Sequence, residues 1–181
     1  MAPVVACLAH QSVLARRKGE VSVLRDLEAA GELSIVDDLG QDLVEITDIC
    51  RRVDSTGRLA AVGLDPFGVG AIVDALAEVG IVGNDRVVGI TQGWKLTGAI
   101  KATERKLADG TLWHGGSKLM AWAVGNARVE PKGNAITITK QASGSAKSDP
   151  LMAVFNAVAL MTTNPQAKGR SYLEANDMLI V

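Results

Sequence analysis

The stretch LAAVGLDPFGVGAIVDALAEVG, residues 59–80, decides the fold class of this chain. Residues 59–64 form a short apolar run, which is typical of a buried β-strand. An Asp-Pro pair beginning at Asp65 ends this run, and a helical segment follows over 70–79 before a glycine stops it. A buried strand that leads directly into a helix predicts an α/β fold.

The segments on either side repeat this alternation of strands and helices. Apolar residues three to four positions apart predict helices, and short apolar runs predict strands. The sequence Lys-Gly-Asn at 132–134 predicts the turn of a hairpin. We therefore expect a mixed β-sheet flanked by helices. The expected helices are 13–30, 41–53, 70–79, 96–108, 117–125 and 150–162, and the expected strands are 32–37, 59–64, 86–91, 127–131 and 134–140.

Composition and charge narrow the class of protein. Of the 181 residues, 48% are hydrophobic and 22% are charged, which is typical of a folded domain rather than a disordered chain. The formal net charge is −1, so any contact with nucleic acid must use a local basic patch. Two cysteines exclude a disulfide scaffold and indicate an intracellular protein. We expect one domain over residues 1–165, a C-terminal tail over 166–181 and no membrane span.

Two Asp-Pro pairs form the candidate site. Asp65 ends a buried strand, and Asp149 precedes the helix expected over 150–162. Ligands of open α/β sheets gather at the carboxyl ends of strands, so both carboxylates could face one edge of the sheet. Paired carboxylates suit Mg²⁺ or Mn²⁺, and two such ions can activate water for attack on a phosphodiester. The structural alternative is that Asp149 is a helix N-cap and Asp65 a turn residue.

Two lysines flank the polar loop that precedes Asp149. Lys140 and Lys147 are placed to contact phosphates if the acidic site is real. Otherwise they only keep the loop soluble.

Other familiar chemistries are disfavoured. Gly68 and Gly70 do not complete a dinucleotide-binding G-x-G-x-x-G pattern, and the sequence contains no P-loop. We therefore expect no nucleotide cofactor. His10 and His114 are too far apart in sequence to suggest a ligand pair, and Cys50 lies beside an apolar stripe typical of a buried thiol.

Five segments together carry a more specific pattern. They are GLDPFGVGAIVDAL at 63–76, ITQGWKLTGAIK at 90–101, RKLADGTLWH at 105–114, MAWAVGNA at 120–127 and KQASGSAKSDPLMA at 140–153. In this order they resemble the C-terminal nuclease domain of the large terminase subunit of tailed bacteriophages. The resemblance covers about residues 12–165.

The resemblance implies an RNase H-like fold and a metal-dependent endonuclease that cuts concatemeric double-stranded DNA during packaging. In that family three acidic residues hold two divalent ions, Mg²⁺ or Mn²⁺. Asp65 matches the second acid and Asp149 the third, so the resemblance assigns both residues catalytic and metal-binding roles.

The chain also departs from the family pattern. The first acid lies on an opening strand upstream of the matching region, so we expect a domain truncated at its N-terminus, with its first strand missing. A partner chain could supply such a strand by edge pairing. The alternative is a non-catalytic remnant or packaging component that binds DNA or a packaging partner without cutting.

The resemblance further implies a set of partners and a location. The expected partners are double-stranded DNA, the portal protein, the small terminase subunit and an ATPase domain on another chain, with no membrane among them. The expected location is the host cytoplasm, with the protein encoded by a phage or prophage.

Overall fold

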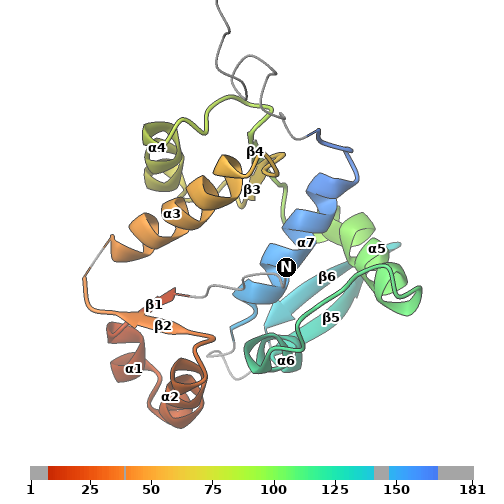
Figure 1. The fold of residues 1–181 in the computed structure, drawn as a ribbon. Coiled ribbons are helices and arrows are strands. Elements are labelled where there is room, and N and C mark those ends of the chain that lie inside the picture. Colours follow the sequence, from red (N-terminus) through yellow and green to blue (C-terminus); the bar gives the residue numbers. More distant parts are fainter. Residues whose placement is uncertain (1–7, 39, 141–146, 167–181) are drawn as a thin grey trace, which may run out of the picture.

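The computed structural model describes residues 8–38, 40–140 and 147–166 (Figure 1). The strands are β1 Leu8–His10, β2 Ser34–Val36, β3 Val62–Leu64, β4 Val87–Gly89, β5 Ala127–Lys132 and β6 Ala135–Lys140. The α-helices are α1 Ser12–Arg16, α2 Val21–Ala29, α3 Gln41–Ser55, α4 Gly70–Glu78, α5 Thr97–Ala108, α6 Lys118–Gly125 and α7 Asp149–Met161. Two 3₁₀ helices, η1 Lys18–Glu20 and η2 Gly93–Leu96, complete the order.

The strands form two parallel pairs and one antiparallel hairpin. Strand β1 pairs with β2, and β3 pairs with β4, both in parallel. Strands β5 and β6 are antiparallel, and only Gly133 and Asn134 connect them. Gly133 has a φ of +62°, which a glycine adopts without strain at the first central position of a tight turn. The mixed strand arrangement with flanking helices is therefore confirmed, although no ladder joins the three pairs within the described residues.

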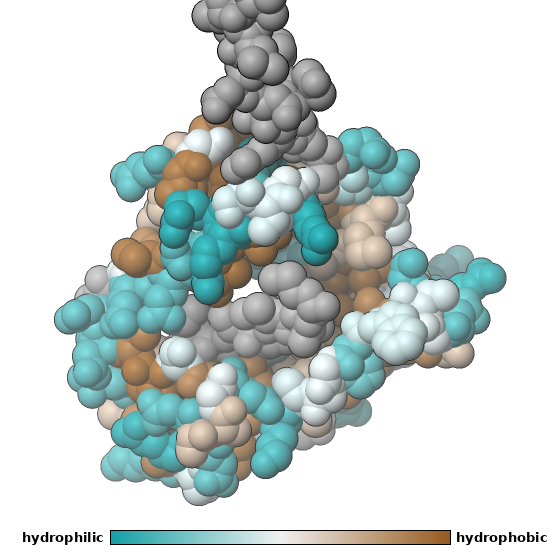
Figure 2. All heavy atoms as spheres, in the orientation of Figure 1, coloured by the Kyte–Doolittle hydropathy of each residue, from teal (hydrophilic) through white to brown (hydrophobic). Residues whose placement is uncertain are grey.

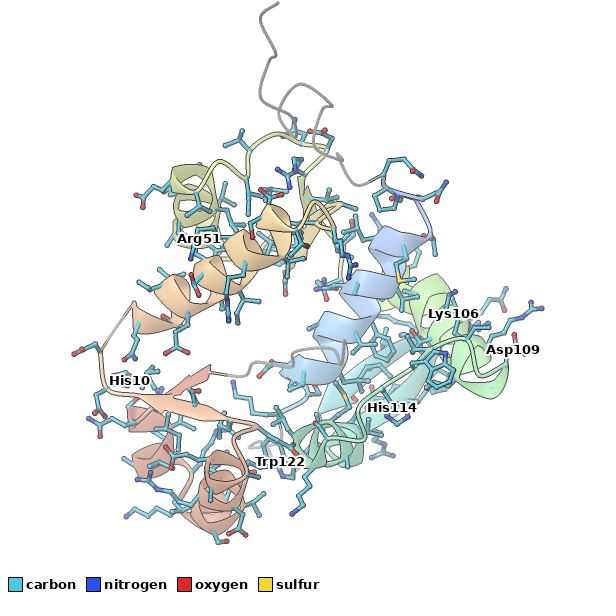
Figure 3. All side chains as sticks on the ribbon, viewed as in Figure 1. His10, Arg51, Lys106, Asp109, His114 and Trp122 are labelled. Carbon is cyan, nitrogen blue, oxygen red and sulfur yellow. The ribbon has the colours of Figure 1, made fainter. Side chains whose placement is uncertain are left out.

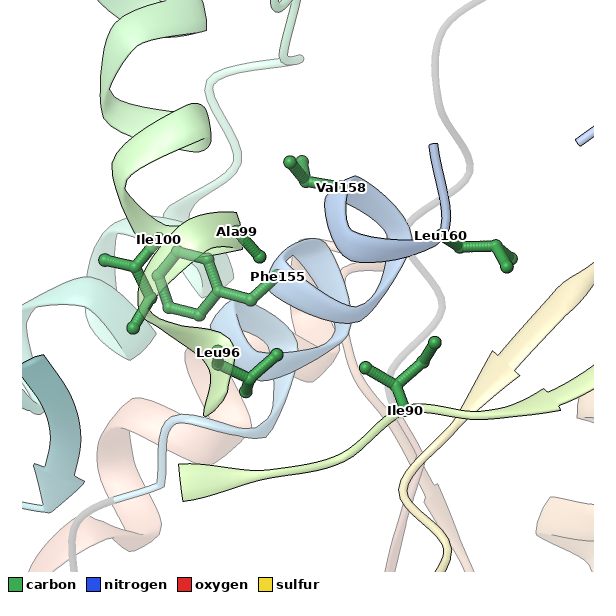
Figure 4. Packing of buried hydrophobic residues seen from close by; sticks show 7 residues of the cluster. All are labelled: Ile90, Leu96, Ala99, Ile100, Phe155, Val158 and Leu160. Carbon is green, nitrogen blue, oxygen red and sulfur yellow. The ribbon is translucent and has the colours of Figure 1, made fainter. Parts of the chain in front are cut away.

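The main core lies where α7 packs against α5 and β4. Figure 4 shows Phe155 of α7 pointing toward Leu96 and Ile100, with Ile90 beside the other part of the helix. Phe155 is 5% exposed and Val158 is 1% exposed. Each such side chain stabilises the fold by about 1.5–3 kcal/mol relative to an exposed position. Helix α7, in blue near the centre of Figure 1, therefore organises the core.

A second cluster holds the N-terminal elements against α6. Its buried members are Leu24 and Leu27 of α2, Leu33, and Leu119 of α6. The half-buried ring of Trp122 packs against them. This cluster explains how elements more than 80 residues apart in sequence come to share one hydrophobic interior.

One expectation about the N-terminal region is wrong, and one strand was missed. The segment 13–30 is not one helix but α1, η1 and α2, because Arg17 leaves the helical region at φ −121° and ψ 50°. Gly19 lies just after this break, where its low helix propensity favours the interruption. Strand β1 was not expected, and its pairing partner is the expected strand of 32–37, which is shorter at Ser34–Val36.

Specific contacts hold β3 and β4 in place. A Cβ at Gly63 would lie 3.5 Å from the Asn156 carbonyl oxygen, so β3 lies directly against α7. The Arg86 guanidinium donates to the Asp54 carboxylate at 2.5 Å, which joins the start of β4 to the end of α3.

On the face seen in Figure 2, hydrophilic side chains dominate the outer border of the molecule. None of the described helices is both long and apolar enough to cross a membrane.

Candidate functional site

Asp65 lies at the carboxyl end of β3, as the sequence predicts. Its side chain is exposed, and its Oδ1 accepts the backbone N–H of Phe67 at 3.1 Å. This bond fixes the orientation of the carboxylate in the turn that leads to α4. Within the described residues Oδ2 of Asp65 makes no hydrogen bond or ion pair.

Asp149 is the first residue of α7 and not its N-cap, so the cap expectation is wrong. The N-cap is Ser148, whose φ of −124° is non-helical and whose side chain is buried. The Asp149 carboxylate instead lies 3.3 Å from the ammonium of Lys147. Both side chains are substantially exposed, so this ion pair contributes less than about 1 kcal/mol. Asp149 also benefits from the positive end of the α7 dipole.

Lys147 is positioned by its backbone as well as by its charge. Its carbonyl oxygen accepts the side-chain N–H of Asn126 at 3.0 Å, which ties the start of α7 to the end of α6. Its ammonium therefore lies beside Asp149. Lys140 ends β6, and its side chain lies outside the described part of the chain, as do residues 141–146. The predicted phosphate contacts of both lysines stay predictions.

The elements that carry the two aspartates touch each other. Strand β3 packs on α7, and Gln92 just beyond β4 donates to the Asn156 amide oxygen of α7 at 3.0 Å. Asp149 lines a cavity of about 110 Å³ together with Trp122 and Lys147, and Asp65 is not part of that lining. Within residues 8–38, 40–140 and 147–166, no three His, Cys, Asp or Glu side chains gather as a metal site. The site of three acids that the resemblance implies is therefore not gathered among the described residues.

The histidines and the described cysteine have local roles. His10 Nε2 donates to the Asp37 carbonyl oxygen at 2.9 Å, and its Nδ1 accepts the Ser12 backbone N–H. Figure 3 shows His10 and His114 well apart, so they form no ligand pair, as expected. Cys50 is half-buried in α3, and burial raises the pKa of its thiol.

An apolar cavity of about 450 Å³ lies between α5, α6 and α7, and the sequence analysis did not predict it. Leu107, Met120 and Val154 line it from three different helices, and His114 is its one titratable lining residue. No local pattern reveals such a cavity, because it depends on how separate helices pack.

A second surface that sequence reasoning missed combines Trp94, Lys95 and Lys132. These residues come from η2 and from the end of β5, and they line one open groove. The one sequence signal for this surface was the tryptophan beside a lysine at 94–95. That these two residues lie next to the β5–β6 hairpin is visible only in the fold.

Comparisons with known proteins agree with the fold. The family described as "Terminase large subunit, endonuclease domain" matches residues 12–164. A structure search finds the large terminase of bacteriophage HK97, with a TM-score of 0.66 and 18% sequence identity. This match covers 83% of the present chain and 32% of the HK97 chain, so the present chain spans about a third of that protein. No curated protein sequence matches.

These findings settle the fold and the family. The structural likeness extends over most of the chain, and the strand and helix arrangement is RNase H-like, as the resemblance implied. The family match covers well over half of the sequence and includes both Asp65 and Asp149. The chain therefore belongs to the family of terminase large subunit endonuclease domains.

Proposed function

We propose that the chain is the nuclease part of a phage DNA-packaging terminase and cleaves concatemeric double-stranded DNA with Mg²⁺ or Mn²⁺. The observation that carries the proposal is the family match over residues 12–164 together with the placement of Asp65 and Asp149. One ends a strand and the other begins the helix on which that strand packs. Packaging takes place in the host cytoplasm, and the chain is phage- or prophage-encoded.

The two carboxylates fit a hard divalent cation by their chemistry. Oxygen donors are the ligands that Mg²⁺ and Mn²⁺ prefer, and Oδ2 of Asp65 has no hydrogen bond to any described residue. Such a cation supplies charge stabilisation to phosphoryl oxygens and lowers the pKa of water. The contribution of Asp65 and Asp149 is to hold the cation, with the Phe67 N–H fixing the angle of the Asp65 carboxylate.

Lys147 would compete with a divalent cation for the Asp149 carboxylate, because its ammonium already lies 3.3 Å away. The exposed Lys147–Asp149 pair is weak, so Asp149 would be able to hold a divalent cation in place of the Lys147 ammonium. The Lys147 ammonium would then be available to neutralise a DNA phosphate. In this proposal Lys147 has two successive partners, and Lys140 contacts the backbone from the end of β6.

Plasmid nicking in Mn²⁺ tests the catalytic proposal. We expect the purified chain to nick supercoiled plasmid, and we expect Asp65→Asn and Asp149→Asn to abolish nicking while circular dichroism stays unchanged. Asp74→Asn is the matched control, because Asp74 is also an exposed aspartate but lies on α4. Nicking that survives both substitutions at the proposed site would overturn the assignment of Asp65 and Asp149.

The second candidate function is binding without cleavage. The observation in its favour is that no three His, Cys, Asp or Glu side chains gather as a metal site within the described residues. Under this alternative the chain binds DNA or a packaging partner such as the portal protein, the small terminase subunit or an ATPase domain. A folded wild-type chain that binds duplex DNA but never nicks it in Mn²⁺ supports this second function over the first.

A further inference from the structure

An open groove lies between η2 and the β5–β6 hairpin. The groove has a volume of about 810 Å³ and lies apart from Asp65 and Asp149, neither of which lines it. Its lining consists of Trp94, Lys95, Thr97, Lys132, Asn134 and Ala135. Two of these six side chains are cationic and none is acidic, in a chain whose net charge is −1.

The aromatic side chain of the groove is exposed. Trp94 is 55% exposed, whereas Leu96, two residues later in the same 3₁₀ helix, is 2% exposed. The Lys95 ammonium lies 5.8 Å from the centre of the Trp94 ring, which is within cation–π range. This contact holds the lysine in place while leaving its charge in solvent. The groove therefore presents an exposed aromatic ring and an adjacent cation together.

The two walls of the groove are fixed to each other. The Thr97 hydroxyl accepts the backbone N–H of Ile136 at 3.1 Å, and its oxygen lies 2.6 Å from the Trp94 carbonyl oxygen. The 3₁₀ turn is thus bound directly to strand β6 of the hairpin. Lys132 and Ala135 form the last pair of the β5–β6 ladder, so the position of Lys132 follows from the same contact. A preformed cradle loses little conformational entropy when a ligand binds.

The cationic side chains of the groove are available to a ligand. Neither Lys95 nor Lys132 forms an ion pair within the described residues, and both are exposed. Arg128 lies on the same face of β5 as Lys132, because residues two apart on a strand share a face. Glu130 lies between them on that face and is the one acidic side chain of the strand.

We propose that this groove binds the sugar–phosphate backbone of double-stranded DNA and holds the duplex outside the Asp65–Asp149 site. Lys95 and Lys132 neutralise phosphates from the two walls, Asn134 donates from the turn, and Trp94 packs against the deoxyribose edge. The inference rests on the proposed function, because it assigns duplex DNA as the ligand. It adds a binding surface to which neither aspartate contributes.

Fluorescence anisotropy with a short labelled duplex in EDTA measures this binding without cleavage. We expect Lys95→Ala combined with Lys132→Ala to weaken binding about tenfold at about 0.1 M salt and to lower the slope of log affinity against log salt by about 2. The matched control removes the same charge elsewhere, as Arg58→Ala combined with Lys118→Ala. Both control residues are exposed and lie outside the groove.

Two further variants test the acidic neighbour and the aromatic ring of the groove separately, the first by affinity and the second by fluorescence. Glu130→Gln removes the acidic neighbour and is expected to tighten binding several-fold. Trp94→Phe is expected to abolish the change in tryptophan fluorescence that DNA binding at the groove causes, whereas Trp113→Phe, at another exposed tryptophan outside the groove lining, leaves that change intact.

The outcomes separate this inference from the proposed function. If the wild type binds duplex and nicks plasmid, but the lysine double variant behaves as its charge-matched control, the groove is excluded and the nuclease proposal stands. If the double variant alone loses affinity and salt slope, the groove is supported whether or not plasmid is cut. If the wild type binds no duplex even at low salt, both proposals fail.

Discussion

The carboxylate of Glu32 accepts the backbone N–H of Leu119 at 2.6 Å, across 87 residues of sequence. It also accepts the N–H of Lys118 at 3.1 Å. The first N–H groups of a helix have no partner within the helix, so Glu32 caps α6 from the segment between α2 and β2. The hydrogen bond from Leu119 is the largest cause that holds the pKa of Glu32 below 4.5.

Glu32→Gln should make the N-terminal elements less stable in a pH-dependent way. Because the pKa of Glu32 is lowered in the fold, its charge stabilises the folded state above pH 4.5, and this contribution is lost as pH falls through the folded pKa. The melting temperature of the variant should be lower than that of the wild type at neutral pH, and the gap should close in acid. Glu104→Gln, an exposed site on α5, is the control. A gap that does not change with pH would contradict this account.

Asp54→Ala should destabilise the fold by about 1–3 kcal/mol, because it leaves the buried Arg86 guanidinium without its charged partner. The Arg86 side chain is only 12% exposed, and its remaining acceptor is the Leu59 carbonyl oxygen at 3.4 Å. Urea denaturation measures the loss. Asp48→Ala removes an exposed aspartate that pairs within α3, and it should cost less than about 1 kcal/mol. Equal losses in the two variants would show that burial of Arg86 is not the cause.

Helix α7 and the β5–β6 hairpin were predictable because their signals are local. The Asp149-Pro150 start and the apolar spacing predicted a helix over 150–162, and the structure has Asp149–Met161. The Lys-Gly-Asn turn likewise predicted the hairpin. The break at Arg17 was not predictable, since the periodic residues before and after it join the same core cluster through separate short helices.

The candidate site was predictable only as two separate residues. The position of Asp65 at the end of a strand is visible in the sequence, because an apolar run precedes it. The Lys147–Asp149 pair and the Gln92–Asn156 hydrogen bond depend on side-chain geometry, and the second joins residues 64 apart. No local pattern encodes such contacts. For the same reason the groove between η2 and the hairpin could not be predicted from the sequence.

Gly63→Val should destabilise the fold by about 1–3 kcal/mol, because the added side chain has no room between β3 and α7. A Cβ at this position would already lie 3.2 Å from Ile90 Cγ1 and 3.6 Å from Leu160 Cδ2. Thermal and urea unfolding measure the effect. Gly98→Ala is the comparison, since its Cβ meets nothing within 4 Å and alanine favours the helix. That variant should be neutral or slightly more stable, and a stable Gly63→Val protein would mean that β3 does not lie against α7.

Cys50 should react slowly with a disulfide reagent in the native protein. Burial raises the pKa of its thiol above the usual 9.0, so less of the reactive thiolate is present near pH 8 than in an unfolded chain. The test uses a Cys7→Ser background, so that only Cys50 reports. The rate should rise when urea unfolds the protein. Equal rates in the native and unfolded states would contradict the burial of this thiol.

Because α7 begins with Asp149 and then contributes Phe155 and Val158 to the core, the interior sets the position of the carboxylate. One residue of helix corresponds to a shift of about 1.5 Å along its axis. Ligand distances at a metal centre tolerate only about 0.2 Å. If Asp149 holds a cation as proposed, repacking around Phe155 that leaves the melting temperature unchanged would still abolish cleavage. Tolerance to interior substitutions would then be limited by positional precision before it is limited by stability.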